Sequence, residues 1–422
     1  YLKLFCEINN PERKEEKQVY LGEQSLYKVI EEYLTKCNEK ISCKLSKPPN
    51  LNIIQDTLKK IAKILWTNKS RYLNYFDAIQ LIDKISPSEF SFDWNRSFTK
   101  ALLDEGLLIK RTIFDKKEKV GFVYDLLGGY LIAKYLLEGK NANDIENLVK
   151  SKDFEEKLLG NHTKCHPLFE DILRSVCVLL PEKFGKHLYE LTKNNRAVSF
   201  SVNSLFEIDL KLIDENSVKF LTKLFSIPKN RKKLLQLFKN TVVHVGHPLN
   251  VIFLDKLLRN LPMAERDFSW TEFVRENSSE FKVEIKKFEK NCRITNSFSE
   301  ILKHRFCLTA QYFFWFPTST NKPLRYITTR ALYWFGRRFP EKLFELTKKS
   351  LTINDPYIPE RMLAASYGVA MALHTDLNCC DFRKDILPKF AKNLYKSMFE
   401  KKAPYSTTHI LMRDYARHTI EI

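Results

Sequence analysis

Apolar residues recur at intervals of three and four positions along most of the 422-residue chain, separated by lysines and glutamates. This spacing is typical of amphipathic helices, and only 11 glycines interrupt it. The chain is therefore predicted to be mainly α-helical. In its first third, helical patterns cover residues Leu51–Trp66, Tyr75–Ile85, Asp93–Gly106 and Leu126–Gly139, and Gly106 is suited to a helix C-terminus.

One segment departs from the helical pattern. Residues Leu107–Asp125 contain two short runs of β-forming residues on either side of a charged turn at Asp115–Lys119, which predicts a hairpin. Three helices followed by a hairpin form the winged-helix arrangement. We expect a winged-helix domain over residues 50–140.

From residue 141 to 422 the helical pattern continues, and we expect an irregular α-solenoid of helical repeats, similar to TPR or HEAT arrays. The segments PEKFGKHLYELTKN (Pro181–Asn194) and PEKLFELTKKS (Pro340–Ser350) are weakly similar to each other. Short breaks between helices are expected at Pro167, Pro181, Pro228, Pro248, Pro262, Pro317, Pro340 and Pro404.

The segment NDPYIPERMLAASYG (Asn354–Gly368) predicts a stiff connector that leads into a helix. Pro359 suits the first turn of that helix, where a missing N–H costs nothing. Ala364, Gly368 and Ala372 follow at four-residue spacing and predict a stripe on which a neighbouring helix can pack closely.

Composition narrows the class of protein. Hydrophobic residues make up 44% of the chain, mean hydropathy is −0.34, and no apolar run approaches the ~20 residues that cross a bilayer, so no membrane partner is expected. Nine cysteines without a CxxC pair suit a reducing, cytoplasmic location. Because the chain begins without Met or a signal peptide, we expect it to be part of a longer protein.

Sequence motifs for catalysis or metal binding are sparse. The chain contains no GxxxxGK[ST], GxSxG or HExxH motif and no EF-hand loop, so no catalytic residue is assigned. A zinc site could be assembled from His162, Cys165 and His166 together with His244 and His247, but their spacing fits isolated residues at helix starts better, and no metal ligand is assigned.

The segment RYITTRALYWFGRRFP (Arg325–Pro340) interleaves arginines with aromatic residues. Such a face could stack bases or bind phosphates. On a helix, however, Ile327, Ala331, Trp334 and Phe335 fall on one side, which favours core packing with the arginines at the edge. The basic segment Pro228–Asn240 favours a solvated helix face in the same way.

Several segments resemble bacterial antiviral STAND ATPases of the Avs type. YLKLFCE (Tyr1–Glu7) resembles the end of the helical lid of the NTPase module, and VGFVYDLLGGYLIAKYLL (Val120–Leu137) resembles the close of the winged helix. MAERDFSWTEFV (Met263–Val274), Asn354–Gly368 and HILMRDYARHTIE (His409–Glu421) resemble motifs downstream of the ATPase. The order of these matches spans the whole chain.

The resemblance implies a parent protein with an N-terminal effector, a central ATP- and Mg-dependent switch and a C-terminal sensor for a phage portal or terminase protein. Residues 1–49 would be the helical end of the NTPase module and 141–422 the sensor, and the parent would form a homo-oligomer on activation. The chain departs from the family pattern because it lacks a P-loop and because its first histidine, His162, lies beyond the winged helix. No cofactor is therefore assigned to this chain. The sequence does not decide whether the chain has an enzymatic activity of its own.

The expected partner-binding residues are Arg325, Arg330, Tyr333, Arg337 and Tyr357, because aromatic and Arg side chains commonly anchor protein interfaces. A nucleic-acid-binding helical repeat is the alternative, suggested by a net charge of +19. The third helix of the expected winged helix argues against reading DNA, since it carries Asp93, Asp104 and Glu105 against Arg96 and Lys100.

Overall fold

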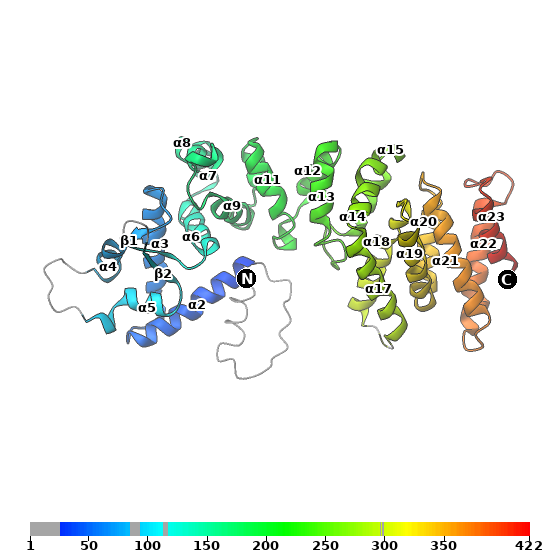
Figure 1. Cartoon of the computed structure of the whole chain (residues 1–422), viewed down its shortest axis with the longest axis horizontal. Coiled ribbons are helices and arrows are strands. Elements are labelled where there is room, and N and C mark those ends of the chain that lie inside the picture. Colours follow the sequence, from blue (N-terminus) through cyan, green and yellow to red (C-terminus); the bar gives the residue numbers. More distant parts are fainter. Residues whose placement is uncertain (1–25, 85–92, 113–116, 296, 298) are drawn as a thin grey trace. The chain divides into compact units, whose positions relative to one another are not determined.

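The computed structural model describes residues 26–84, 93–112, 117–295, 297 and 299–422 (Figure 1). The fold is mainly α, with one small three-stranded antiparallel sheet. The motif at Tyr1–Glu7 lies outside the described residues. Within them, no helix is long and apolar enough to span a membrane.

Contacts between residues divide the chain into two compact units, Tyr1–Asp214 and Glu215–Ile422. This division differs from the domain boundaries expected at residues 49/50 and 140/141, which stay predictions. In this division, residues 141–214 lie in the same unit as the helices and the hairpin of the expected winged helix.

The first unit holds the sheet and the helices that surround it. Its helices are α2 (Leu26–Lys44), α3 (Ile53–Thr67), α4 (Tyr75–Asp83), α5 (Phe98–Asp104), α6 (Asp125–Leu137), α7 (Ala142–Lys150), α8 (Lys152–Phe154), α9 (Phe169–Phe184), α10 (Leu188–Leu191) and α11 (Asn195–Ser204), and its strands are β1 (Leu73–Asn74), β2 (Leu108–Thr112) and β3 (Glu118–Phe122). Short helices lie at Pro49–Leu51, Trp94–Arg96, Glu155–Leu159, His162–Lys164 and Leu210–Leu212.

Helix α5 is stabilised at its start by a carboxylate and at its end by a glycine. At its start, the Asp83 carboxylate of α4 accepts hydrogen bonds from the Phe98 N–H (2.5 Å) and the Thr99 hydroxyl (2.6 Å). At its end, Gly106 has φ of +70°, and the N–H of Leu107 donates to the carbonyl of Leu102 at 3.0 Å. This is the Schellman pattern, so the predicted role of Gly106 is confirmed.

The predicted hairpin is confirmed as strands β2 and β3, which pair antiparallel with Ile109 opposite Gly121. The middle of its turn, residues 113–116, lies outside the described residues. A third strand, β1, pairs with the other side of β3 and gives the order β1-β3-β2. The sequence did not predict β1, because a strand of two residues has no periodicity of its own.

Helices α6 and α9 pack closely against each other at Gly129. An added Cβ at Gly129 of α6 would lie 2.5 Å from the backbone carbonyl carbon of Asp171 and 2.8 Å from the N of Ile172, both on α9. Only glycine, which has no Cβ, allows this approach. Gly129 therefore sets the spacing of two central helices of the first unit.

The second unit is helical throughout its described residues. It consists of α12 (Glu215–Phe225), α13 (Pro228–Phe238), α14 (Val251–Arg259), α15 (Met263–Arg266), α16 (Glu272–Glu276), α17 (Ser278–Ile294), α18 (Glu300–Phe313), α19 (Lys322–Arg338), α20 (Pro340–Ser350), α21 (Tyr357–His374), α22 (Leu387–Met398) and α23 (Ile410–Glu421), with short helical turns at Asp267–Thr271, Phe316–Thr318 and Phe382–Ile386.

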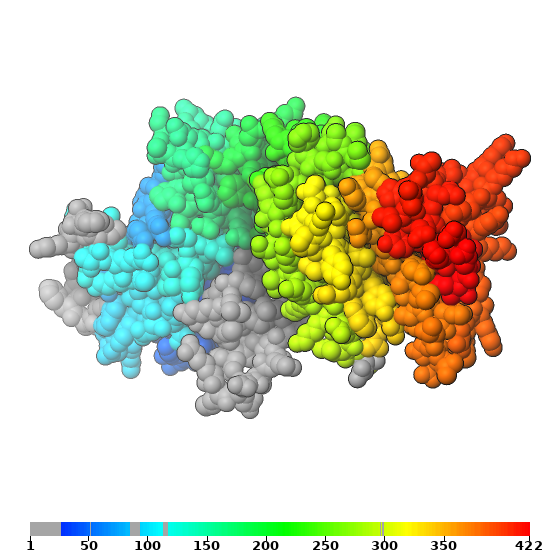
Figure 2. Space-filling model, turned by 45° about the vertical axis from the view of Figure 1, so that its right-hand side comes forward, coloured from blue at the N-terminus to red at the C-terminus, as the bar shows by residue number. Residues whose placement is uncertain are grey.

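From α17 onward, alternate helices of the second unit pack on one another. Helix α17 contacts α19, α19 contacts α21, and α21 contacts α23, while α18, α20 and α22 lie between them in sequence. Successive segments consequently follow one another in chain order across the unit, from green to red (Figures 1 and 2).

Prolines have different roles in the two segments that are similar in sequence. Pro340 occupies the first position of α20, as expected, and Pro228 likewise begins α13. The break predicted at Pro181 is wrong, because this residue lies inside α9, which continues to Phe184. The similarity between Pro181–Asn194 and Pro340–Ser350 therefore does not mark equivalent positions in the fold.

The stretch at Asn354–Gly368 forms the predicted helix start, since α21 begins at Tyr357 and places Pro359 in its first turn. Ala364, Gly368 and Ala372 are only half-buried. The close approach between α19 and α21 is made at Gly336 instead, where an added Cβ would lie 2.8 Å from Val369 Cγ2. Of the predicted stripe, Gly368 faces α19, since an added Cβ would lie 3.1 Å from Tyr333 Cδ2, while the contact at Gly336 was not predicted.

Candidate partner-binding site

The five residues expected to bind a partner lie on two adjoining helices. Arg325, Arg330, Tyr333 and Arg337 belong to α19, and Tyr357 begins α21. The predicted apolar side of α19 is largely confirmed, as Ala331 and Phe335 are fully buried and Ile327 and Trp334 are half-buried.

Arg325 is part of the packed interior of the second unit. Its side chain is 8% exposed, its Nη1 donates to the carbonyl of Ser319 at 2.8 Å, and its guanidinium lies 4.6 Å from the ring centroid of Tyr357. These contacts hold the start of α21 against α19. Tyr357 itself is 44% exposed, so the pair places a tyrosine at the surface with a buried arginine behind it.

The other α19 residues form contacts of their own. Arg330 is exposed and its Nη2 lies 2.9 Å from Glu289 Oε2 on α17. Arg337 Nη1 donates to the hydroxyl of Tyr333 at 3.2 Å, and the Tyr333 ring lies beside Gly368 of α21. The structure therefore pairs Arg325 with Tyr357 and Arg337 with Tyr333, and leaves Arg330 and Tyr357 as the most accessible of the five.

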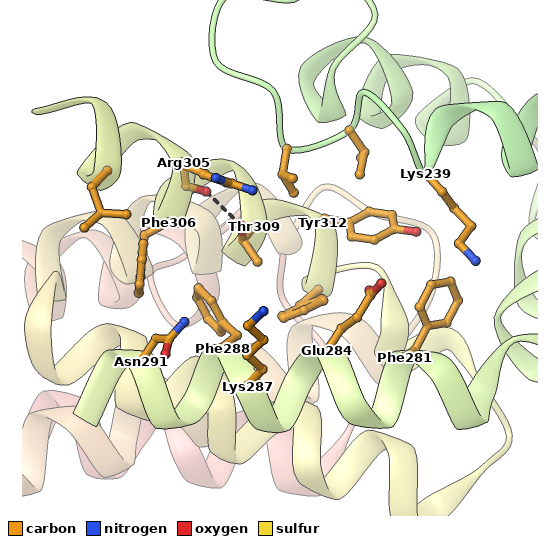
Figure 3. A pocket seen from close by; sticks show the side chains of 14 residues that line it. Lys239, Phe281, Glu284, Lys287, Phe288, Asn291, Arg305, Phe306, Thr309 and Tyr312 are labelled. Carbon is orange, nitrogen blue, oxygen red and sulfur yellow. Dashed lines mark hydrogen bonds between the residues drawn. The ribbon is translucent and has the colours of Figure 1, made fainter. Parts of the chain in front are cut away.

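A pocket that sequence reasoning missed lies between the end of α13, helix α17 and helix α18 (Figure 3). Its volume is ≈ 360 Å³. The lining combines aromatic, aliphatic, polar and charged side chains: Lys239, Val242, Val243, Phe281, Glu284, Lys287, Phe288, Asn291, Leu302, Arg305, Phe306, Thr309, Tyr312 and Phe313.

The aromatic floor of this pocket is a network of rings that hold one another in place. Phe281 and Tyr312 meet edge to face at 6.1 Å, and Phe288 lies 5.3 Å from both Phe306 and Phe313. All five rings are buried. Because edge-to-face and tilted contacts restrict each ring, the floor has a fixed shape.

The rim of the pocket carries an excess of positive charge. Lys239 is held by Glu280 at 2.5 Å, whereas the Lys287 ammonium and the Arg305 guanidinium make no hydrogen bond or ion pair with any residue that the structure describes. Lys287 and Glu284 extend from α17 into the pocket, opposite Arg305 of α18 (Figure 3). Partial burial, reinforced by the nearby Glu280 charge, raises the pKa of Glu284 above its ordinary value.

No family model, curated protein or solved structure matches this chain. The assignment of a site therefore depends on the geometry of the chain itself.

Two of the histidines that could have formed a zinc site accept local hydrogen bonds instead. His166 Nδ1 accepts from the N–H of Leu168 at 3.0 Å, and His247 Nδ1 accepts from the N–H of Leu249 at 2.9 Å. Across the described part of the chain, no group of three or more His, Cys, Asp or Glu side chains is placed to hold a metal ion.

A sequence signal for the pocket exists in hindsight. Phe281 and Phe288 are seven residues apart on α17, as are Phe306 and Phe313 on α18, so each pair lies on one helix face. Two helices with matching aromatic faces predict that the faces meet. The spacing does not predict that the meeting faces leave a cavity or which cations border it.

Proposed function

We propose that this chain is the sensor and switch portion of an antiviral STAND NTPase, which recognises a phage protein and thereby triggers oligomerisation and activation of an effector. The observation that carries the proposal is the serial packing of the second unit, in which α17 packs on α19, α19 on α21 and α21 on α23. A pocket opens at the surface beside α17. Arrays of this kind offer extended surfaces that suit recognition of another folded protein.

The serial packing also supports reading the helices after residue 141 as an irregular α-solenoid. In a solenoid each repeat contacts chiefly its neighbours, and the next-but-one contacts in the second unit fit a repeat of two helices. The resemblance of Met263–Val274, Asn354–Gly368 and His409–Glu421 to motifs downstream of STAND ATPases agrees with this interpretation.

The switch would be a winged helix formed by α3, α4, α5 and the hairpin of β2 and β3. Helix α6, which follows the hairpin, packs on α3 and on α9. A movement of this part on partner binding would release whole molecules for assembly, with ATP and Mg bound by the upstream NTPase module of the parent.

Co-expression of the full-length parent with single phage proteins tests the proposal. We expect a stable complex and effector activation with a portal or terminase protein and with no major capsid protein. The proposal fails if neither a portal nor a terminase protein forms a complex.

In a complex so found, Arg330→Glu tests whether the α19 surface contributes. We expect about a tenfold loss of affinity, which corresponds to ~1.4 kcal/mol, because Arg330 is exposed beside the pocket-bearing helix α17. Arg325 is unsuitable for this test, since it is buried and its reversal would disturb folding. Because Arg330→Glu removes the ion pair with the buried Glu289, thermal unfolding first checks that this variant is folded. An unchanged affinity in Arg330→Glu would place the contact elsewhere.

A further inference from the structure

We propose that the pocket between the end of α13, α17 and α18 binds a segment of the partner protein in which an apolar side chain is flanked by carboxylates. The inference rests on the proposed function and adds the chemistry of the recognised segment. Its two parts, an apolar anchor and acidic neighbours, come from two separate features of the pocket.

The apolar part follows from the shape of the floor. A volume of ≈ 360 Å³ lies at the lower end of the range of about 300–1,000 Å³ found for ligand pockets, and it suits one or two side chains better than a long ligand. Phe281, Phe288 and Tyr312 are held by contacts with neighbouring rings, so the floor has its shape before a side chain binds. A pre-formed apolar floor lowers the entropic cost of binding.

The acidic part follows from the rim. Lys287 and Arg305 approach the cavity from two different helices, and neither charge is neutralised by a described residue. A carboxylate beside an inserted apolar side chain would meet these cations, and the Arg305 fork can hold it with two hydrogen bonds. Lys239 contributes less, because Glu280 already pairs with it.

A nucleic acid fits the pocket less well than a peptide. Glu284 extends into the cavity (Figure 3) and Glu280 pairs with the lining residue Lys239, so a phosphate chain would meet carboxylates as well as cations.

Fluorescence anisotropy on the whole 422-residue chain tests the inference. The probe is a labelled hexapeptide with a central Phe-Leu pair and two glutamates on each side. Two comparators replace either the glutamates by glutamines or the Phe-Leu pair by two serines, and labelled oligothymidylate is a third ligand. We expect the probe to bind at least about tenfold more tightly than either comparator, a difference of ~1.4 kcal/mol.

The variant Lys287→Glu with Arg305→Glu should lower probe affinity by at least about tenfold. Lys290→Glu is the matched control, because Lys290 is exposed on the same helix but borders a different hollow. It should bind the probe as the unmodified chain does. Thermal unfolding followed by circular dichroism checks that all three proteins are folded.

Four results would overturn the inference: no probe binding, equal binding of either comparator, equal losses in the double variant and in Lys290→Glu, or a preference for oligothymidylate that the double variant abolishes. Failure here is separable from failure of the proposed function. A phage protein bound equally well by the double variant would keep the sensor function and exclude this pocket.

Discussion

At the scale of single residues, buried histidines make the fold sensitive to acid. His247 is 5% exposed, and its Nδ1 accepts a hydrogen bond from the N–H of Leu249. Burial, together with the nearby His244, lowers the pKa of His247 to about 4. Protonation of His247 Nδ1 would place its N–H donor against the N–H donor of Leu249 and break this hydrogen bond. Burial lowers the pKa of His166 and His187 for the same reason.

The lowered pKa of His247 predicts a loss of stability on acidification. The unfolded chain takes up a proton near pH ~6.5, whereas the folded chain resists it until pH falls to about 4. The contribution of neutral His247 to the free energy of unfolding is therefore complete above pH ~6.5. It is lost as the pH falls from ~6.5 to about 4, by up to ~3 kcal/mol. Urea unfolding at pH 7 and at pH 4.5 measures the difference.

His247→Asn is the informative variant, because an asparagine side chain can still accept the bond from Leu249 but does not titrate. We expect it to reduce the difference in unfolding free energy between the two pH values by about 2–3 kcal/mol. His304→Asn, at an exposed position, serves as the control. An undiminished difference in His247→Asn would show that other groups carry the acid sensitivity.

At the scale of helices, glycines decide how closely neighbours pack. At Gly129 an added Cβ would meet backbone atoms of α9, whereas at Gly368 it would meet only the Tyr333 ring, at 3.1 and 3.4 Å. A side chain can relieve such a contact by changing its rotamer, whereas a helix backbone can do so only if the whole helix moves. The two positions therefore separate a glycine that sets helix spacing from one that does not.

Gly129→Ala should lower the free energy of unfolding by about 1–3 kcal/mol, because forcing α6 and α9 apart outweighs the ~1 kcal/mol that alanine contributes to helix propensity. Gly368→Ala should be neutral or slightly stabilising, since the Tyr333 ring is half-buried and can shift. Chemical denaturation of both variants measures this. Equal effects at the two positions would contradict the assignment of Gly129 as the closer contact.

The helices also illustrate which parts of the fold could be predicted from the sequence and which could not. Helices α3 to α6 and the hairpin were predictable because periodicity, caps and β-forming runs are local signals. Pro181 was misread because a helix tolerates a proline when its packing is retained, and α9 is buried along most of its length. The pocket was missed because its lining comes from three separate segments, whose meeting depends on packing between helices rather than on any one pattern.

At the scale of the whole molecule, the net charge of +19 attracts any polyanion. If this attraction is unspecific, binding to duplex DNA should fall at least ~100-fold between 50 and 300 mM NaCl, because phosphate contacts release counterions. We expect no submicromolar DNA binding at ~150 mM salt. Filter binding across a salt series measures it. Tight binding that persists at that salt concentration would instead favour the nucleic-acid-binding alternative.

The next-but-one packing of α17, α19, α21 and α23 also bears on how the second unit folds. Contacts between near neighbours in sequence close short loops, which favours rapid folding and allows structure to spread from one helix pair to the next. The two ends of such a series need not open together. Amide hydrogen exchange would then differ along the series, and a partner seated beside α17 would slow exchange first in the helices nearest to it.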